Sequence, residues 1–446
     1  MGSGGNRLIE TDYAGPVQSA DRVAPERRAS SKARTAVAAA VVGNVLEWYD
    51  FAVYTFLAAL IGRNFFPSGD PSVELLYSFA VFGMGFLARP LGGIVIGRLG
   101  DVKGRKTALL LTIFLMASGT VLVGLAPTYA AAGIVGPLVI LVARLMQGFS
   151  AGGEWGGSTA FIVEWAPEGK RGFYGSFQQC SVAGGLLLGS GFAALLSTVL
   201  SPEAMEGWGW RVPFLLGGVL GPVGLWMRRT MEETPAYTRT SEAPARPPLA
   251  RGKAFQLAGR AFGFTVLWTV SYYIFLSYMP TFTAQYADLT GAQALWSNTA
   301  GLLMLVVAIP FWGHLSDRTG RRPLLLACCA AFLILPYPVA NFLVSAPPFW
   351  AILVLQLVMA VIIALFSGAG PAAIAEIFPT RSRSTLMTTG YAFSVAIFGG
   401  FAPYIATWLI RQTGSPVAWV YYVMAAAVIS GLVIYRLEET AHAPLR

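Results

Sequence analysis

The stretch GRLGDVKGRKT, residues 97–107, recurs later in the chain as GHLSDRTGRRP, residues 313–323. Its identical positions stand at a constant offset of 216 residues: Gly97, Leu99, Asp101, Gly104 and Arg105 correspond to Gly313, Leu315, Asp317, Gly320 and Arg321. A second motif recurs at a similar offset of 212, because EWAPEGKR from Glu164 matches EIFPTRSR from Glu376 at its Glu, Pro and Arg. Two separate motifs repeated at nearly one offset indicate that the chain consists of two duplicated halves.

The composition assigns these halves to a membrane. The chain has 446 residues, of which 55% are hydrophobic and only 12% are charged, and its mean hydropathy is +0.60. Soluble domains carry about 25% charged residues. The 50 glycines fit closely packed membrane helices. The three cysteines lie in apolar segments without metal-ligand spacing, and both histidines fall outside the expected spans, so we predict no metal or cofactor.

A membrane-spanning helix needs about 20 mostly apolar residues, and the sequence contains twelve such segments. We expect an all-α membrane protein with a disordered cytoplasmic tail (1–35), an N-terminal six-helix bundle (36–227), a polar, Pro-rich cytoplasmic linker (228–253), a C-terminal six-helix bundle (254–436) and a short cytoplasmic tail (437–446). The expected spans are 36–62, 75–98, 108–126, 136–160, 173–199, 210–227, 256–283, 292–312, 323–343, 349–368, 386–410 and 416–435.

The basic residues orient this layout. Of the 31 lysines and arginines, 26 fall on the side of the two termini, and Arg63, Arg211 and Arg411 fall on the other side. The remaining two, Arg89 and Arg144, lie within spans. An excess of basic residues marks the cytoplasmic side of a membrane protein. We therefore expect both termini in the cytoplasm of a bacterial-type inner membrane, and the net charge of +9 reflects topology rather than nucleic-acid binding.

The repeated motifs suit a reversible contact between the halves. Gly97 allows neighbouring helices to turn tightly and approach, and Asp101 can lie at a helix N-terminus and pair with a basic residue. Such clusters hold the ends of helices together in one conformation and release them in another. The alternative is an ordinary loop rich in basic residues. The predicted latch residues are Gly97, Asp101, Arg105, Glu164, Arg171, Asp317, Arg321, Glu376 and Arg383.

Charged residues deep in the spans occur only in the first half. They are Glu47 and Asp50 in the first span, Arg89 in the second, and Arg144 and Glu154 in the fourth. A charge at the bilayer centre costs about 2.5–3.5 kcal/mol on insertion scales, so such residues face the interior or water and mark functional sites. We expect them to line one side of a central cavity.

Helical spacing adds polar neighbours to these charges. Residues three or four apart share a helix face, which places Asn44, Glu47, Asp50 and Tyr54 on one stripe and Arg144, Gln147, Ala151, Glu154 and Ser158 on another. The second half is expected to complete the cavity with Trp268, Tyr272, Tyr273 and Asn298.

Each deep charge has a functional and a structural interpretation. Arg89 suits an anionic substrate, because a guanidinium binds a carboxylate through two parallel hydrogen bonds; alternatively it pairs with Asp50 or Glu47. Arg144 is a further candidate for direct contact with the substrate. Glu47, Asp50 and Glu154 are the candidate proton carriers, and Glu154 is alternatively a packing partner between helices.

Several motifs resemble the major facilitator superfamily. The repeated loops and ARLMQG (143–148) resemble superfamily signatures, and further segments are similar to its metabolite:proton symporters. These segments are GNVLEWYDFAVY (43–54), FLARPLGG (86–93), GGEWGG (152–157), KRGFYGSFQQ (170–179, which includes Gln178), SYYIFLSYMP (271–280) and IFGGFAPYIATWLI (397–410). Members of that family carry citrate, tricarballylate, α-ketoglutarate, shikimate or proline and betaine. The resemblance to the superfamily also implies a role in proton coupling as the alternative for Arg144.

The resemblance implies a monomeric, proton-coupled symporter that imports a small organic acid by alternating access. Substrate-binding candidates are Arg89, Arg144, Tyr54, Gln147, Gln178, Trp268, Tyr272, Tyr273 and Asn298, and the loop motifs are expected to stabilise the outward-open state. A zwitterion carrier for proline or betaine is the alternative, although such carriers typically extend into a coiled coil, whereas this chain ends at RLEETAHAPLR. A receptor, an enzyme and a channel fit the residues less well.

Overall fold

The computed structural model describes residues 44–443 with the exception of 104, 153, 165, 230–250 and 379–382. The expected N-terminal tail and most of the expected linker lie outside these residues. All regular elements in the described part are helical. This observation confirms the expected all-α architecture.

The helices of the first half, up to residue 229, are Asn44–Phe56, α2 (Ala58–Phe65), α3 (Pro71–Leu87), α4 (Arg89–Lys103), α5 (Arg105–Leu125), α6 (Tyr129–Ala132), α7 (Val135–Ser150), α8 (Glu154–Glu164), α9 (Arg171–Val199), α10 (Pro202–Ala204), η1 (Met205–Gly209) and α11 (Arg211–Arg229). Those of the second half are α13 (Arg251–Tyr272), η2 (Tyr273–Tyr278), α14 (Met279–Tyr286), α15 (Gly291–Thr319), α16 (Arg321–Ile334), α17 (Pro336–Val344), α18 (Phe349–Ile377), α19 (Arg383–Ser394), η3 (Val395–Gly399), α20 (Ala402–Thr413) and α21 (Trp419–Tyr435).

These helices have the length and composition of membrane spans. In the described residues, seven continuous helices are long and apolar enough to cross a bilayer, and two bent pairs bring the number to nine. Two shorter apolar helices, Leu110–Leu125 and Trp419–Tyr435, and the 19-residue α11 account for the other three expected segments. Every one of the twelve expected spans therefore overlaps a helix. Because α15 continues to Thr319, His314 lies inside a helix rather than in the expected loop.

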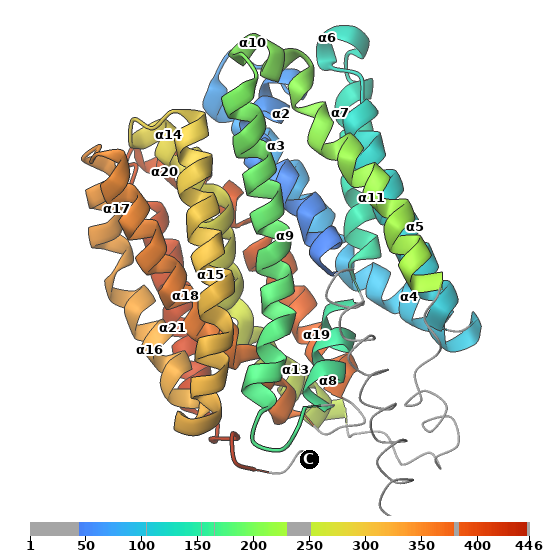
Figure 1. Ribbon diagram of the computed structural model, residues 1–446, viewed down its shortest axis with the longest axis vertical. Helices are drawn as coiled ribbons and strands as arrows, with labels where there is room; N and C mark the ends of the chain where they lie inside the picture. The colour runs from blue at the N-terminus through green and yellow to red at the C-terminus, as the bar shows by residue number, and fades with distance from the viewer. Residues whose placement is uncertain are drawn as a thin grey trace, which may run out of the picture.

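The two halves stand side by side, with α9 of the first half against α15 of the second (Figure 1). Glycines permit this close approach. A Cβ on Gly172 would lie 2.5 Å from the Gly313 carbonyl oxygen, and one on Gly313 would lie 2.7 Å from the Gly172 oxygen. Gly97, the counterpart of Gly313, is different, because it is exposed and a Cβ there would meet nothing within 4 Å. The close approach expected at Gly97 is therefore not found, although its counterpart makes one. We call the end of the molecule that carries both loops the basic end.

A second glycine contact brings the arginine-bearing helices together. A Cβ on Gly148 of α7 would lie 1.6 Å from the Gly85 oxygen of α3, and one on Gly152 would lie 2.1 Å from the Arg89 oxygen. Small residues let membrane helices pack backbone to backbone. Arg89 is the first residue of α4, directly before Pro90, which lacks the N–H group that a continuous helix would use. The two deep arginines, Arg89 and Arg144, are consequently anchored on closely packed helices.

Replacing Gly148 with alanine should disrupt this packing. The added methyl group has to displace backbone, and overpacking of this kind costs about 1–3 kcal/mol. We expect the Gly148→Ala variant to unfold several degrees lower than the unmodified protein in detergent, as measured by differential scanning fluorimetry. Gly157→Ala is the matched control, because a Cβ on this helical glycine meets no atom within 4 Å. Equal melting temperatures for the two variants would refute the packing role of Gly148.

Candidate substrate and proton site

Two buried arginines form the centre of the site. Arg89 is 3% exposed and Arg144 is 0% exposed. The Arg89 guanidinium carbon lies 4.4 Å from the Phe86 ring centroid, and the Arg144 carbon lies 4.6 Å from that of Tyr54. Aromatic faces attract cations more strongly when both are desolvated. The rings therefore hold the two charged groups in an apolar environment.

Both guanidinium groups retain unused hydrogen-bond donors. The Nε and Nη2 atoms of Arg89 and of Arg144 are buried and have no partner among the described residues. Buried polar groups are normally hydrogen-bonded, so exceptions call for an explanation. An anionic group of a bound substrate would satisfy these donors.

Asp50 is connected to Arg144 through two intermediate side chains. The Arg144 Nη1 donates to Gln147 Oε1 at 2.7 Å, and Gln147 Nε2 donates to the Thr120 hydroxyl at 2.8 Å. The Thr120 hydroxyl in turn donates to Asp50 Oδ2 at 2.6 Å. Asp50, Thr120, Gln147 and Arg144 thus form one buried polar chain across three helices. Gln147 uses both ends of its amide to position Arg144 within this chain.

Glu47 lies in a different environment from Asp50. Tyr391 of α19 is within electrostatic interaction range of both Arg89 and Glu47. The electrostatic partners of Asp50 include Arg144 rather than Arg89. Among the described residues no ion pair joins Arg89 to Asp50, so this alternative pairing is not formed. Asp50 is instead linked to Arg144, whereas Glu47 shares the neighbour Tyr391 with Arg89.

The shared stripe expected on the first helix also needs correction. Asn44 donates to Ser181 of α9 at 2.6 Å, whereas Asp50 accepts from Thr120 of α5. Tyr54 donates to the Ser78 carbonyl of α3 at 3.1 Å. Residues three and four apart drift around a helix of 3.6 residues per turn, and the helix is surrounded by protein. Its polar side chains consequently point to three different neighbours rather than into one cavity.

Tyr273 of the second half reaches into the first-half aromatic cluster. Its ring centroid lies 5.4 Å from that of Phe86, 6.1 Å from Phe82 and 6.5 Å from Trp48. Tyr273 begins the π-helical turn η2, and such turns are frequent at functional sites. Its buried hydroxyl has no partner among the described residues. The second half therefore closes the Arg89 neighbourhood with an aromatic residue.

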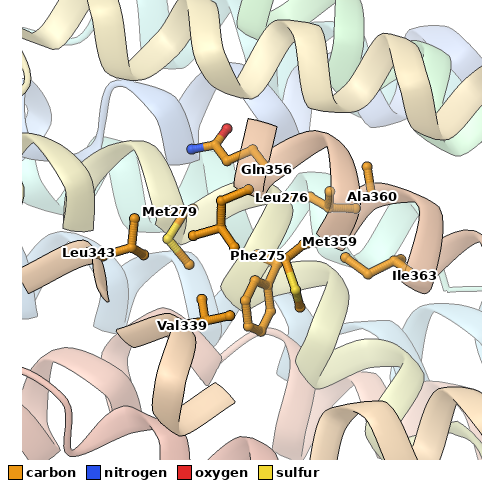
Figure 2. Close-up of a pocket in the computed structure, with 10 residues that line it drawn as sticks. Phe275, Leu276, Met279, Val339, Leu343, Gln356, Met359, Ala360 and Ile363 are labelled. Atoms are coloured by element: carbon orange, nitrogen blue, oxygen red, sulfur yellow. The ribbon is translucent and has the colours of Figure 1, made fainter. Parts of the chain in front are cut away.

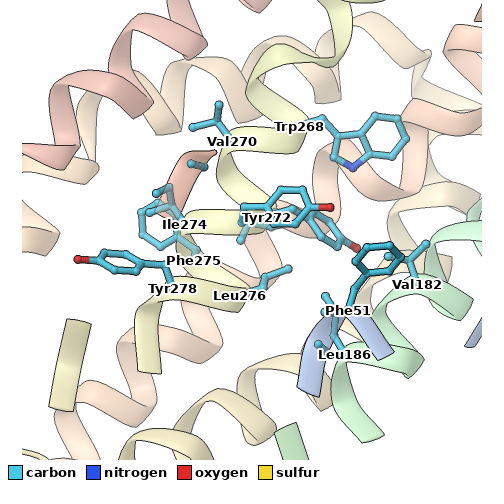
Figure 3. Packing of buried hydrophobic residues seen from close by; sticks show 14 of the residues in the cluster. Phe51, Val182, Leu186, Trp268, Val270, Tyr272, Ile274, Phe275, Leu276 and Tyr278 are labelled. Carbon is cyan, nitrogen blue, oxygen red and sulfur yellow. The ribbon is translucent and has the colours of Figure 1, made fainter. Parts of the chain in front are cut away.

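A second aromatic contact joins the halves nearer the basic end. Trp155 of α8 stacks on Tyr391 with ring centroids 3.8 Å apart, and the ring of Trp268 of α13 lies 5.9 Å from it. Figure 3 shows Trp268 and Tyr272 on the side of α13 that faces first-half residues. The Tyr272 hydroxyl and the Gln178 Nε2 atom are buried without a described partner. Trp268 and Tyr272 thus lie at the interface between the halves, and the role of these residues and Gln178 in substrate binding stays a prediction.

Two further predicted site residues have other surroundings. Asn298 uses its amide Nδ2 atom to donate to Ser190 of α9 and to the Leu276 carbonyl, so it ties α15 to its neighbours. The side chain of Glu154 lies outside the described part of the structure.

A small apolar pocket between α17 and α18, which contains Gln356, is lined by second-half residues alone and is separate from both arginines (Figure 2).

The repeated EWAPEGKR and EIFPTRSR motifs exchange partners across the halves. Arg383 of the second half pairs with Glu164 of the first at 2.6 Å, and Arg171 of the first pairs with Glu376 of the second at 3.3 Å. Glu376 also binds Arg321 at 3.3 Å. The predicted latch residues of these motifs therefore hold the basic ends of the two halves together.

The second copy of the loop motif makes the helix-terminus contact that was expected of the first. Asp317 accepts hydrogen bonds from the backbone N–H groups of Gly172 and Phe173, at 2.8 and 2.9 Å, at the N-terminus of α9. It also pairs with Arg321 at 2.8 Å. The side chains of Asp101 and Arg105 lie outside the described part, so their predicted role stays a prediction.

The segment after α21 completes the basic end, a contact that the sequence did not reveal. Glu439 accepts from the backbone N–H groups of Arg321 and Arg322, both at 2.9 Å, and Thr440 donates to Glu376 at 2.6 Å. Burial alone would raise the pKa of Glu439, but hydrogen bonds from Arg321, Ala441 and neighbouring amides outweigh this effect and hold the pKa below its usual value. Glu439 therefore caps α16 as an ionised group.

The halves also touch at the opposite end. Arg411 pairs with Asp70 at 3.4 Å, and Trp296 donates to Thr198 at 3.1 Å. With contacts at both ends, the described conformation is closed on both sides of the site. It differs from the outward-open state that the latch motifs were expected to stabilise.

Sequence reasoning missed several site residues. Thr120 lies in an apolar span without a nearby charge in the sequence, and only the fold brings it to Asp50. The aromatic residues Trp48, Phe51, Phe82 and Phe86 read as ordinary membrane packing. The recurrence of aromatic residues next to the deep charges in GNVLEWYDFAVY and FLARPLGG is the signal that could have identified them.

This fold, with a buried charged site between two duplicated six-helix halves, defines a secondary-transporter class. Residues 35–262 match the family model described as "Sugar (and other) transporter", and residues 284–445 match "Major Facilitator Superfamily". The chain belongs to the major facilitator superfamily. A solved structure of the proton:xylose symporter XylE superposes with a TM-score of 0.74 at 18% identity, covering 93% of this chain and 98% of that one, which supports the fold.

The relatives place the chain among the metabolite:proton symporters, and it is a transporter rather than an enzyme. It is 36% identical over 431 residues to a proline/betaine transporter of Salmonella typhimurium, covering 93% of this chain and 85% of the relative. It is also 36% identical to a citrate-proton symporter of Klebsiella pneumoniae (90% and 91% covered) and to an alpha-ketoglutarate permease of Escherichia coli (91% and 93% covered).

The exchanged ion pairs lead to a prediction about the basic end. Glu376→Gln removes the charge that binds Arg171 and Arg321, and loss of one partner of a buried pair costs about 3–5 kcal/mol. We expect the variant to populate separations at the basic end that are longer than those of the parent. Spin labels on the exposed residues Glu168 and Arg318, in a background without native cysteines, measure this distance.

The control is Glu206→Gln, which removes a half-exposed pair with Arg63 within the first half. This control should leave the distance distribution unchanged. If the Glu376→Gln distribution coincides with that of the control, the exchanged pairs do not hold the basic end closed.

Proposed function

We propose that this protein is a proton-coupled importer of a small zwitterion that carries a carboxylate, of the proline or betaine type. The observation that supports this proposal is the balance of charge at the site. Among the described side chains, the buried charges at the site are two acids, Glu47 and Asp50, and two arginines, Arg89 and Arg144. Asp50 is linked to Arg144 through hydrogen bonds, and Glu47 shares the neighbour Tyr391 with Arg89. A net-neutral substrate adds no net charge to such a site.

The Arg89 neighbourhood suits both ends of a zwitterion. The free Nε and Nη2 donors of Arg89 form the fork that binds a carboxylate, while Glu47 supplies a negative charge for the cationic end. The rings of Trp48, Phe86 and Tyr273 lie around this position and attract an alkylated ammonium group through their faces. Several relatives, among them the Salmonella protein, are named as proline/betaine transporters.

The proton carrier that we propose is Asp50. It lies beside the substrate neighbourhood and is linked to Arg144 through Thr120 and Gln147. Protonation would remove the negative charge of Asp50 from this series of hydrogen bonds. This change would permit the loaded carrier to reorient. We propose uptake as the direction of transport, because a proton gradient directed into the cell drives a proton symporter inward. We propose no cofactor other than the coupling proton.

A small organic acid remains the second candidate. Two arginines with unused donors in one site favour a substrate with more than one carboxylate. Relatives named as a citrate-proton symporter and an alpha-ketoglutarate permease are similar to this chain to the same degree.

Uptake into proteoliposomes with an imposed pH gradient distinguishes these candidates. We expect accumulation of radiolabelled glycine betaine or proline that stops when a protonophore collapses the gradient. Citrate, α-ketoglutarate and shikimate should not accumulate and should compete weakly. Accumulation of an organic acid without betaine or proline would overturn the zwitterion proposal, and accumulation that survives the protonophore would overturn proton coupling.

The Asp50→Asn variant tests the proton carrier. Asparagine keeps the hydrogen bond from Thr120 but cannot bind or release a proton. We expect gradient-driven accumulation to fall by about tenfold or more, which corresponds to ~1.4 kcal/mol of lost coupling. Exchange of internal for external substrate should continue. The control is Glu206→Gln at an exposed position. Undiminished accumulation in Asp50→Asn would exclude Asp50 as the carrier.

A further inference from the structure

One aromatic ring lies between the two charged neighbourhoods. The Phe51 ring centroid is 4.7 Å from the Arg89 guanidinium carbon and 4.8 Å from that of Arg144. In the described part of the chain, no other ring makes cation–π contacts with both arginines. Trp48 and Phe86 contact only Arg89, while Tyr54 and Phe82 contact only Arg144. Phe51 is therefore the shared neighbour of the two sites.

We propose that Phe51 is the positioning residue that couples substrate binding at Arg89 to proton binding at Asp50. This inference rests on the proposed function, since it requires a carboxylate-bearing substrate and a coupling proton. It assigns to Phe51 a role other than packing, because the ring determines where both guanidinium groups stand relative to each other.

The surroundings of Phe51 fix its ring. The side chain is 1% exposed, and its ring packs against Phe86 at 5.2 Å and Trp48 at 6.1 Å. Both arginines keep Nε and Nη2 atoms without a partner among the described residues, so each guanidinium has donors for a new ligand. We expect displacement of either cation from the Phe51 ring to change the environment of the other cation.

The sign of the coupling follows from electrostatics. The two guanidinium charges repel each other across one ring. Arg144 favours an ionised Asp50 directly, and we propose that Arg89 adds to this positive potential at longer range. A substrate carboxylate that binds Arg89 neutralises the charge of Arg89 and draws its guanidinium group away from the Phe51 ring. The positive potential around Asp50 then falls, so substrate and proton favour each other's binding. Thermodynamic linkage makes the effect reciprocal, with coupling factors that typically reach 5–150-fold.

Asp50 has a small number of polar neighbours that mediate this effect. On its own helix the neighbour is Tyr49, whose hydroxyl donates to the Pro213 carbonyl of α11. On α5 it is Thr120, on α7 they are Gln147 and Arg144, and on α11 Gly217 lies against the carboxylate. Among these described groups, Arg144 is the one with a charge, and Phe51 is its ring contact to Arg89.

The test replaces the ring while keeping apolar volume. Phe51→Leu is compared with Phe86→Leu, which removes a ring from Arg89 alone, and with Phe82→Leu, which removes a ring from Arg144 alone. For each variant, proteoliposomes report the ratio of gradient-driven accumulation to substrate exchange and the number of protons moved per substrate. We expect Phe51→Leu to lower the ratio of accumulation to exchange by about tenfold, which lies within the usual range of coupling factors. The number of protons moved per substrate should also fall. Phe86→Leu should raise KM and Phe82→Leu should alter rate, with the proton ratio retained in both.

A graded replacement covers the case in which Phe51→Leu fails to fold. Phenylalanine with one, two or three ring fluorines at position 51 keeps the shape of the side chain and progressively weakens its cation–π attraction. The proposal predicts that the proton ratio falls stepwise with fluorination. An unchanged ratio across the series, or an equal loss in all three leucine variants, would reduce Phe51 to a packing residue and overturn the proposal.

The outcome for the unmodified protein separates this inference from the function on which it rests. If the unmodified protein shows no proton-coupled uptake of a carboxylate-bearing solute, the proposed function fails and the role of Phe51 falls with it. If the unmodified protein is coupled but the Phe51 variants keep the full proton ratio, only the inference fails.

Discussion

Buried charge between membrane helices is the constraint on which this structure depends. Glu47, Asp50, Arg89 and Arg144 are each at most 9% exposed, at depths where an uncompensated charge costs several kcal/mol. The protein compensates these charges in two ways, through the polar chain from Asp50 to Arg144 and through aromatic faces beside both arginines. Glycine contacts between α3, α4 and α7 bring the two arginines close enough for this arrangement.

The two halves are alike in the motifs at the basic end of the molecule and differ in the residues that they contribute to the buried site. The repeated EWAPEGKR and EIFPTRSR motifs both form ion pairs, and each motif pairs with residues of the other. The repeat therefore holds the two halves together at the basic end. The described deep charges belong only to the first half, and the second half contributes Tyr273, Trp268 and Tyr391. Rocking of one half against the other would therefore move an aromatic surface over a charged one.

The sequence predicted the elements of this fold well and their contacts poorly. Apolar length located every expected span, including 349–368 within α18, because burial in lipid requires a long run of apolar residues. It did not reveal the 61° bend at Leu57, which depends on packing around the first helix. Glu47, Asp50, Arg89 and Arg144 were also identified correctly as buried. The hydrogen-bonded chain from Asp50 to Arg144 was not predicted, because Thr120 reaches Asp50 only through tertiary contacts, and helical spacing alone placed Asn44 and Asp50 on one face.

Proton uptake on substrate binding tests the central claim that the Arg89 and Asp50 neighbourhoods are coupled. Purified protein in weakly buffered detergent solution, with a pH-sensitive dye, receives glycine betaine or proline at saturating concentration. We expect binding to remove protons from solution, and we expect Asp50→Asn to abolish this signal while the substrate still binds. Binding by the unmodified protein with no proton uptake would show that the two neighbourhoods are not coupled, and uptake that persists in Asp50→Asn would show that Asp50 does not carry the proton.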